Sequence, residues 1–201
     1  MNKNNISKIE VLVEELTKLH DLTLNNMIFT GFNLTGNSTF NALRENYFNG
    51  ILLKSCAIWV DKSSNKQNCS IYNIASRSKN DQFKNTFKEY YDLKLPNHKL
   101  NIQLNYLYKI FSNVRNKKIA HISNSSIDKF DVLIGHIDVL YTDIVKLLKQ
   151  YPSSVIPNIN ILSSRDKLFN TRCLCNDIVG IKQIIDKMHD ICKVVNTNIE
   201  E

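Results

Sequence analysis

Apolar residues recur at steps of three and four along almost the whole chain, and no alternating pattern of useful strand length interrupts them. The most regular stripe consists of Ile127, Phe130, Ile134, Ile137, Tyr141, Ile144 and Leu148. A stripe of this period places its side chains on one face of a helix, and facing stripes pack as antiparallel bundles. The sequence therefore predicts an all-α fold, an antiparallel up-and-down helical bundle.

The predicted helices form one domain over residues 1–201. The first two run over 6–29 and 38–61, two short ones over 70–78 and 82–91, and the last over 177–195. Helices over 98–122 and 127–148, joined by the turn at 123–126, form a predicted central hairpin over about 98–150. Pro152 and Pro157 bracket an irregular connection, and a C-terminal helical extension occupies about 163–197.

Several classes of protein are excluded by what the sequence lacks. Only 5 glycines are present, and none belongs to a glycine-rich phosphate loop, which excludes Rossmann and P-loop nucleotide sites. The first residues contain no apolar export segment, and no apolar run is long enough to span a bilayer. We therefore expect a soluble cytoplasmic protein without a membrane partner.

The 5 cysteines are an odd number in a chain without an export signal, so reduced thiols are expected. Cys173, Cys175, His189 and Cys192 are of the types that zinc accepts as ligands. On one continuous helix, however, Cys173 and Cys175 would point in nearly opposite directions. Small buried thiols at a helix interface are the alternative that we prefer, and we expect no metal site.

The charge of the chain is positive and unevenly distributed. The 26 basic and 19 acidic residues give a net charge of +7, which favours polyanionic partners. No acidic residue lies between Asp92 and Asp128, whereas this stretch contains Lys94, Lys99, Lys109, Arg115, Lys117 and Lys118. The stretch is the predicted positive face, although lysines of a solvated surface would give the same pattern.

Within this positive stretch, the segment Arg115-Asn116-Lys117-Lys118-Ile119-Ala120-His121 carries groups suited to phosphodiester chemistry. At about 100° per residue, Arg115 and His121 flank the apolar stripe of their helix on opposite sides. An arginine can hold a phosphate bidentately, and a histidine can transfer a proton near neutral pH. A structural alternative is that His121 caps the helix end and Arg115 is a surface cation.

The spacing of Arg115 and His121, with Asn116 directly after the arginine, resembles the R-x(4–6)-H signature of the HEPN superfamily (higher eukaryotes and prokaryotes nucleotide-binding). The segment is most similar to the abortive-infection, phage-resistance branch. A second likeness to this branch is a helix ending Ile58-Trp59-Val60-Asp61, followed by a polar loop and then Asn68-Cys69-Ser70-Ile71. Together the two likenesses cover residues 51–148.

The resemblance implies a helical homodimer in which the motif helices of both subunits form one composite cleft. Active members are endoribonucleases of toxin–antitoxin and phage-defence systems that need no metal or other cofactor. His121 would transfer the proton, Arg115 would bind the phosphate and stabilise its charge, and Asn116 would orient the site. Lys109, Lys117 and Lys118 would guide the RNA backbone.

Three functions remain open from the sequence. The first is the dimeric ribonuclease, with an antitoxin or another defence-system protein as a possible partner. One branch is neutralised at a tyrosine two residues after the histidine, but this chain has Ser123 there. The second is a catalytically silent HEPN module that binds RNA or nucleotide or scaffolds a partner. The third is a helical interaction protein that packs the 111–148 surface against a partner helix.

Overall fold

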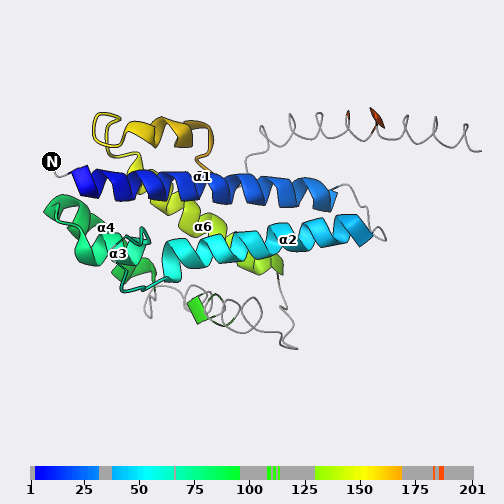
Figure 1. The fold of residues 1–201 in the computed structure, drawn as a ribbon, viewed down its shortest axis with the longest axis horizontal. Coiled ribbons are helices and arrows are strands. Elements are labelled where there is room, and N and C mark those ends of the chain that lie inside the picture. Colours follow the sequence, from blue (N-terminus) through cyan, green and yellow to red (C-terminus); the bar gives the residue numbers. More distant parts are fainter. Residues whose placement is uncertain are drawn as a thin grey trace, which may run out of the picture.

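Two long antiparallel helices, α1 (Lys3–Gly31) and α2 (Ser38–Ser55), lie side by side and form one side of the fold (Figure 1). The computed structural model describes residues 3–31, 38–65, 67–95, 108–109, 111, 113, 130–168, 183 and 186–187. An ion pair between Lys54 and Glu15 connects the two helices. The predicted apolar face of α1 is buried, at Ile9, Leu12, Val13, Leu16 and Leu19.

Directly after α2, the chain makes a wider turn, the π-helical η1 (Cys56–Val60). It ends where the Asp61 amide donates a hydrogen bond to the Cys56 carbonyl at 2.9 Å, five residues back. Ile58, Trp59 and Val60 are all buried, although consecutive residues point to different sides of a helix. Most of the turn is therefore covered by other elements, and of its residues Ala57 is exposed.

Two shorter helices pack against each other next to η1. In α3 (Ile71–Arg77), the hydroxyl of Ser70 caps the N-terminus by accepting a hydrogen bond from the Asn73 amide. In α4 (Asp81–Lys94), the Asn80 side chain accepts the corresponding bond from the Phe83 amide. The buried face of α4 consists of Phe83, Phe87, Tyr90 and Tyr91.

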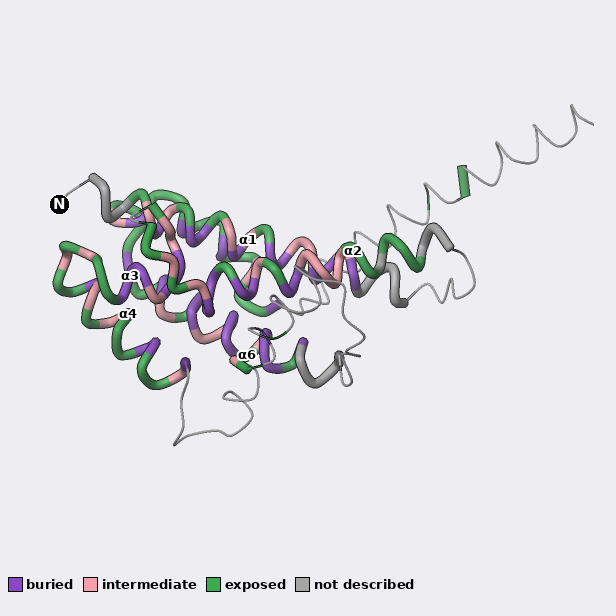
Figure 2. Tube along the Cα trace, turned by 60° about the horizontal axis from the view of Figure 1, so that its bottom comes forward, coloured by how far each residue is buried: buried purple, intermediate pink, exposed green. Residues whose placement is uncertain are grey.

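Helix α6 (Phe130–Leu148) packs between α1 and α4. On one side, Tyr90 donates a hydrogen bond to the Leu140 carbonyl at 3.0 Å. On the other side, the Tyr141 ring lies 6.2 Å from the ring of the buried His20 of α1. Buried residues of the helices concentrate where the elements meet, and exposed residues lie outside (Figure 2). Helix α6 is therefore at the centre of the core.

After α6, a 3-10 helix, η3 (Pro157–Ser164), returns the chain to α1. Arg165 follows it and forms an ion pair through Nε with Asp21 Oδ1 at 3.2 Å. The Tyr141 hydroxyl donates to the Arg165 carbonyl at 2.8 Å. Between Pro152 and Pro157 the chain forms bends and turns, as the predicted irregular connection requires, and η3 begins at Pro157. Arg165 fastens the end of η3 to both α1 and α6.

The prediction of an all-α fold is confirmed, because the described residues contain helices, turns and loops and no strand. The regular stripe from Ile134 to Leu148 is buried, and so is Phe111 of the preceding predicted helix. Most of that helix, the turn at 123–126 and most of the C-terminal extension lie outside the described residues. The central hairpin and the up-and-down bundle therefore stay predictions.

The first half of α2 lies outside the core, since its described side chains between residues 41 and 46 are all exposed, Leu43 among them. Phe48 is partly buried against the core, and Ile51 and Leu52 are fully buried in it. No helix among the described residues is both long and apolar enough to cross a membrane.

Candidate functional site

The residues predicted to cut RNA, Arg115, Asn116 and His121, lie outside the described residues, as do Lys117 and Lys118. Lys109, the remaining predicted RNA contact, is described and exposed. The metal ligands that were considered and set aside, Cys173, Cys175, His189 and Cys192, also lie outside. What the structure describes is the start of the segment that leads into the motif and the surface beside it.

The start of this segment is fixed in the core at Phe111, four residues before Arg115. Phe111 is fully buried, and its carbonyl accepts a hydrogen bond from the Cys56 thiol of η1 at 3.3 Å. The wider π-helical turn brings this thiol to the backbone of a segment far along the chain. Phe111 therefore connects the start of the motif segment to η1.

A chain of buried hydrogen bonds supports η1 from the opposite side. Trp59 Nε1 donates to the Tyr90 hydroxyl at 3.2 Å, and that hydroxyl donates to the Leu140 carbonyl. Burial raises the pKa of Tyr90 far above its usual range, so the phenol stays protonated and keeps donating. The two hydrogen bonds hold η1, α4 and α6 in one arrangement.

The residues of the second sequence likeness hold the two ends of one loop together. Asp61 Oδ2 accepts a hydrogen bond from Asn68 Nδ2 at 2.7 Å, and the Asp61 carbonyl accepts one from the Ser70 hydroxyl at 2.7 Å. Asp61 Oδ1 accepts another bond from the Ser63 amide at 2.9 Å. This arrangement, the Asp61 clamp, joins the end of η1 to the beginning of α3.

The Asp61 clamp places the next residue, Lys62, among three tyrosines. Its Nζ atom lies 5.5 Å from the ring centres of Tyr72 and Tyr108 and 5.9 Å from that of Tyr91. Partial burial lowers the pKa of Lys62, but the hydroxyl groups of Tyr108 and Tyr91 outweigh this effect and raise it. Lys62 is therefore a cation that joins α3 and α4 to Tyr108, seven residues before Arg115.

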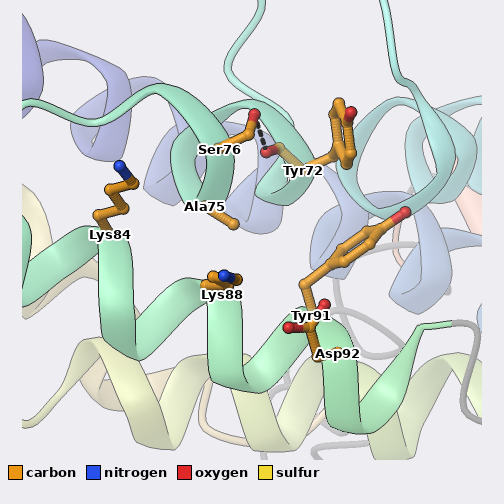
Figure 3. A pocket seen from close by; sticks show the side chains of 7 residues that line it. All are labelled: Tyr72, Ala75, Ser76, Lys84, Lys88, Tyr91 and Asp92. Atoms are coloured by element: carbon orange, nitrogen blue, oxygen red, sulfur yellow. Dashed lines mark hydrogen bonds between the residues drawn. The ribbon is translucent and has the colours of Figure 1, made fainter.

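A pocket of about 300 Å³ lies beside this cluster, between α3 and α4. In Figure 3, Lys84 and Lys88 stand on α4 opposite Ala75 of α3, while Tyr72 and Tyr91 lie together at one end. None of the ion pairs between described residues involves a side chain of this pocket. The pocket is lined further by Ser76 and Asp92.

One lysine of the predicted positive face is neutralised by an acidic residue from another helix. Lys94 Nζ lies 2.8 Å from the Asp143 carboxylate of α6. The absence of acidic residues between Asp92 and Asp128 is a property of the sequence, and the fold brings Asp143 to this stretch. Lys94 is therefore not part of the positive face, whereas Lys109 stays exposed.

Within the described part of the chain, no group of three or more histidine, cysteine or acidic residues could hold a metal ion. The two cysteines described, Cys56 and Cys69, are not in disulfides. No family model, no curated protein and no solved structure matches this chain. The functional argument therefore depends on its own residues.

The sequence alone did not indicate the pocket. Lys84, Lys88 and Asp92 follow one another at steps of four, so the sequence places them on one face of α4. Many solvent-exposed helices have the same pattern, and it therefore does not indicate a pocket. Tyr108 is half-buried next to Lys62. The buried His20 lies with Nδ1 at 3.3 Å from Asp21 Oδ1.

Proposed function

We propose that this chain is a metal-independent endoribonuclease of a bacterial abortive-infection or toxin–antitoxin defence system. The observation that carries this proposal is the spacing of Arg115, Asn116 and His121 within a stretch free of acidic residues. An all-α fold and a buried Phe111 just before the motif support it. The HEPN family, which the segment resembles, supplies the expected dimeric arrangement.

In the proposed reaction, the 2′-hydroxyl of a ribose attacks the adjacent phosphorus, and the bond from phosphorus to the 5′ oxygen breaks. The products are a 2′,3′-cyclic phosphate and a 5′-hydroxyl end. His121 transfers the proton, and Arg115 stabilises the additional negative charge on the phosphate oxygens. Asn116 orients the reacting groups, while Lys109, Lys117 and Lys118 bind neighbouring phosphates.

The test is incubation of the purified protein with end-labelled structured RNA in excess EDTA. We expect cleavage by the wild type and a loss of at least about a hundredfold in rate for His121→Ala and for Arg115→Ala. His98→Ala and Arg77→Ala, which change the same residue types outside the motif, serve as matched controls. RNA with 2′-O-methyl groups should bind but stay intact.

A second candidate, the catalytically silent RNA-binding module, is favoured by the basic and aromatic lining of the pocket between α3 and α4. It predicts RNA binding that His121→Ala does not change, without cleavage by any variant. Cleavage that persists in His121→Ala, or that EDTA abolishes, would contradict the proposed mechanism.

A further inference from the structure

The pocket between α3 and α4 presents three kinds of group in a fixed order. Lys84 and Lys88 are one helical turn apart on α4, and Asp92 follows one turn further on the same face. Tyr72 and Tyr91 lie at the Asp92 end, with their ring centres 5.4 Å apart. The pocket therefore has a cationic end and an aromatic end that also offers a hydrogen-bond acceptor.

Each end suits one part of a nucleotide. The ammonium groups of Lys84 and Lys88 form no ion pair with a carboxylate among the described residues, so they are suited to bind a phosphate. An aromatic side chain is suited to stack on a base. The Asp92 carboxylate can accept a hydrogen bond from the exocyclic amino group of cytosine or another amino-bearing base, and it repels a phosphate from that end.

The size and position of the pocket favour one unpaired nucleotide within a strand. A volume of about 300 Å³ is at the lower limit for pockets that bind small molecules, and it cannot hold a duplex. Lys88 and Asp92 are exposed, so the pocket opens to solvent and a bound nucleotide can stay joined to the rest of a strand. Beyond Tyr72 and Tyr91, the cluster around Lys62 reaches Tyr108 and the exposed Lys109.

We infer that this pocket binds one unpaired, amino-bearing nucleotide of a single-stranded RNA, with its phosphate at Lys84 and Lys88 and its base at Tyr72 and Asp92. The inference rests on the proposed function in taking RNA as the substrate. It assigns a second RNA contact on α3 and α4, in addition to the one predicted around Arg115. The pocket would select which part of a strand is presented to the motif segment.

The first experiment measures binding of fluorescent oligocytidylate by full-length His121→Ala protein, which keeps the RNA intact. The double variant Lys84→Gln/Lys88→Gln should bind about tenfold more weakly than the control Lys146→Gln/Lys167→Gln. Its affinity should also fall less steeply with salt, by about 1.4 in the double-logarithmic slope, because two phosphate contacts are lost. The control pair removes two exposed lysines outside the pocket.

Two further variants test the aromatic end. Tyr72→Leu should weaken binding about tenfold through the loss of one stacked base, whereas Tyr72→Phe should bind like the parent protein. Asp92→Ala should abolish a preference for oligocytidylate over oligouridylate. The ratio of the two affinities is the readout, because removal of a negative charge raises affinity for both strands.

Equal affinities of the pocket and control double variants, with unchanged circular dichroism and melting temperature, would overturn the inference. Free cytidine monophosphate that competes at concentrations near those of the oligomer would show a pocket for free nucleotides and would overturn the strand assignment. Cleavage is measured separately with His121 intact. If the protein cleaves RNA but the pocket variants bind it normally, the ribonuclease proposal is supported and the pocket inference is wrong. If binding depends on the pocket but no RNA is cleaved, the pocket is supported and the ribonuclease proposal is wrong.

Discussion

Tyr90 of α4 forms hydrogen bonds that connect three elements of the core, η1, α4 and α6. Its hydroxyl accepts a hydrogen bond from Trp59 Nε1 and donates one to the Leu140 carbonyl. All three groups are buried, where a polar atom that loses its partner cannot find water instead. The tyrosine could not be assigned this role from the sequence, because both partners are distant along the chain.

We expect Tyr90→Phe to lower the free energy of unfolding by about 1–3 kcal/mol, since it leaves the Trp59 donor and the Leu140 acceptor without their partner. Urea denaturation at neutral pH measures this loss. Tyr72→Phe, which removes a hydroxyl from a half-buried ring outside this chain of bonds, should change stability by less than about 0.5 kcal/mol. Equal losses in the two variants would contradict the assignment.

The buried tyrosines also predict a loss of stability at alkaline pH. Burial raises the pKa of Tyr90 and of Tyr141 above the ordinary value of 10.0, so the folded state keeps protons that the unfolded state releases. Their contribution is complete below pH 10 and is lost as the pH rises above it, by up to about 1.4 kcal/mol per pH unit for each tyrosine. Urea denaturation at increasing pH should show this slope, and Tyr90→Phe should reduce it. An unchanged slope in that variant would exclude Tyr90 as a source.

Among the elements, α3 and α4 have N-terminal caps of different kinds. The hydroxyl of Ser70 caps α3 and also donates to the Asp61 carbonyl, and it is buried. The side chain of Asn80 caps α4 through one bond at a half-buried position. Ser70 therefore contributes both to a helix and to the Asp61 clamp.

We expect Ser70→Ala to cost more stability than Asn80→Ala, for which about 1 kcal/mol is typical of a lost cap. The additional loss in Ser70→Ala comes from the Asp61 carbonyl, which loses its hydrogen bond. Ser70→Ala should also make the loop at 62–68 more sensitive to limited proteolysis, and Asn80→Ala should not. Equal stability losses with unchanged proteolysis would mean that the hydrogen bond from Ser70 to the Asp61 carbonyl does not stabilise the fold.

Apolar periodicity predicted the long helices well and the wide turn not at all. In α1 and α6, buried residues such as Leu16 and Ile144 repeat at helical spacing, so the pattern determines which face is covered. In η1, Cys56 to Val60 are all apolar, and a segment without polar residues gives no periodic signal. The ion pair of Lys94 with Asp143 was unpredictable for another reason, since sequence proximity does not report which helices become neighbours.

At the scale of the whole molecule, the two parts of the candidate site differ in whether the sequence alone could predict them. The motif around Arg115 is a local pattern and could be found in the sequence. The pocket beside Lys62 is formed between two helices, and it could be found only once their packing was known.

A composite site requires two copies of the chain, so the proposed ribonuclease should lose specific activity on dilution. We expect the rate per chain to rise with protein concentration and to level off where sedimentation velocity shows that the dimer is complete. His121→Ala should dimerise like the wild type and stay inactive. Full activity in a preparation that sediments as a monomer would contradict the composite site.

The contact of Arg165 with Asp21 joins residues 144 positions apart in sequence. During synthesis, α1 leaves the ribosome first, yet the segment that covers this part of it is made only when residue 165 has been translated. Until then, α1 lacks the cover that η3 and Arg165 provide. Completion of this part of the core thus requires translation through Arg165, and ribosome stalling between α6 and Arg165 would yield a chain that chaperones retain.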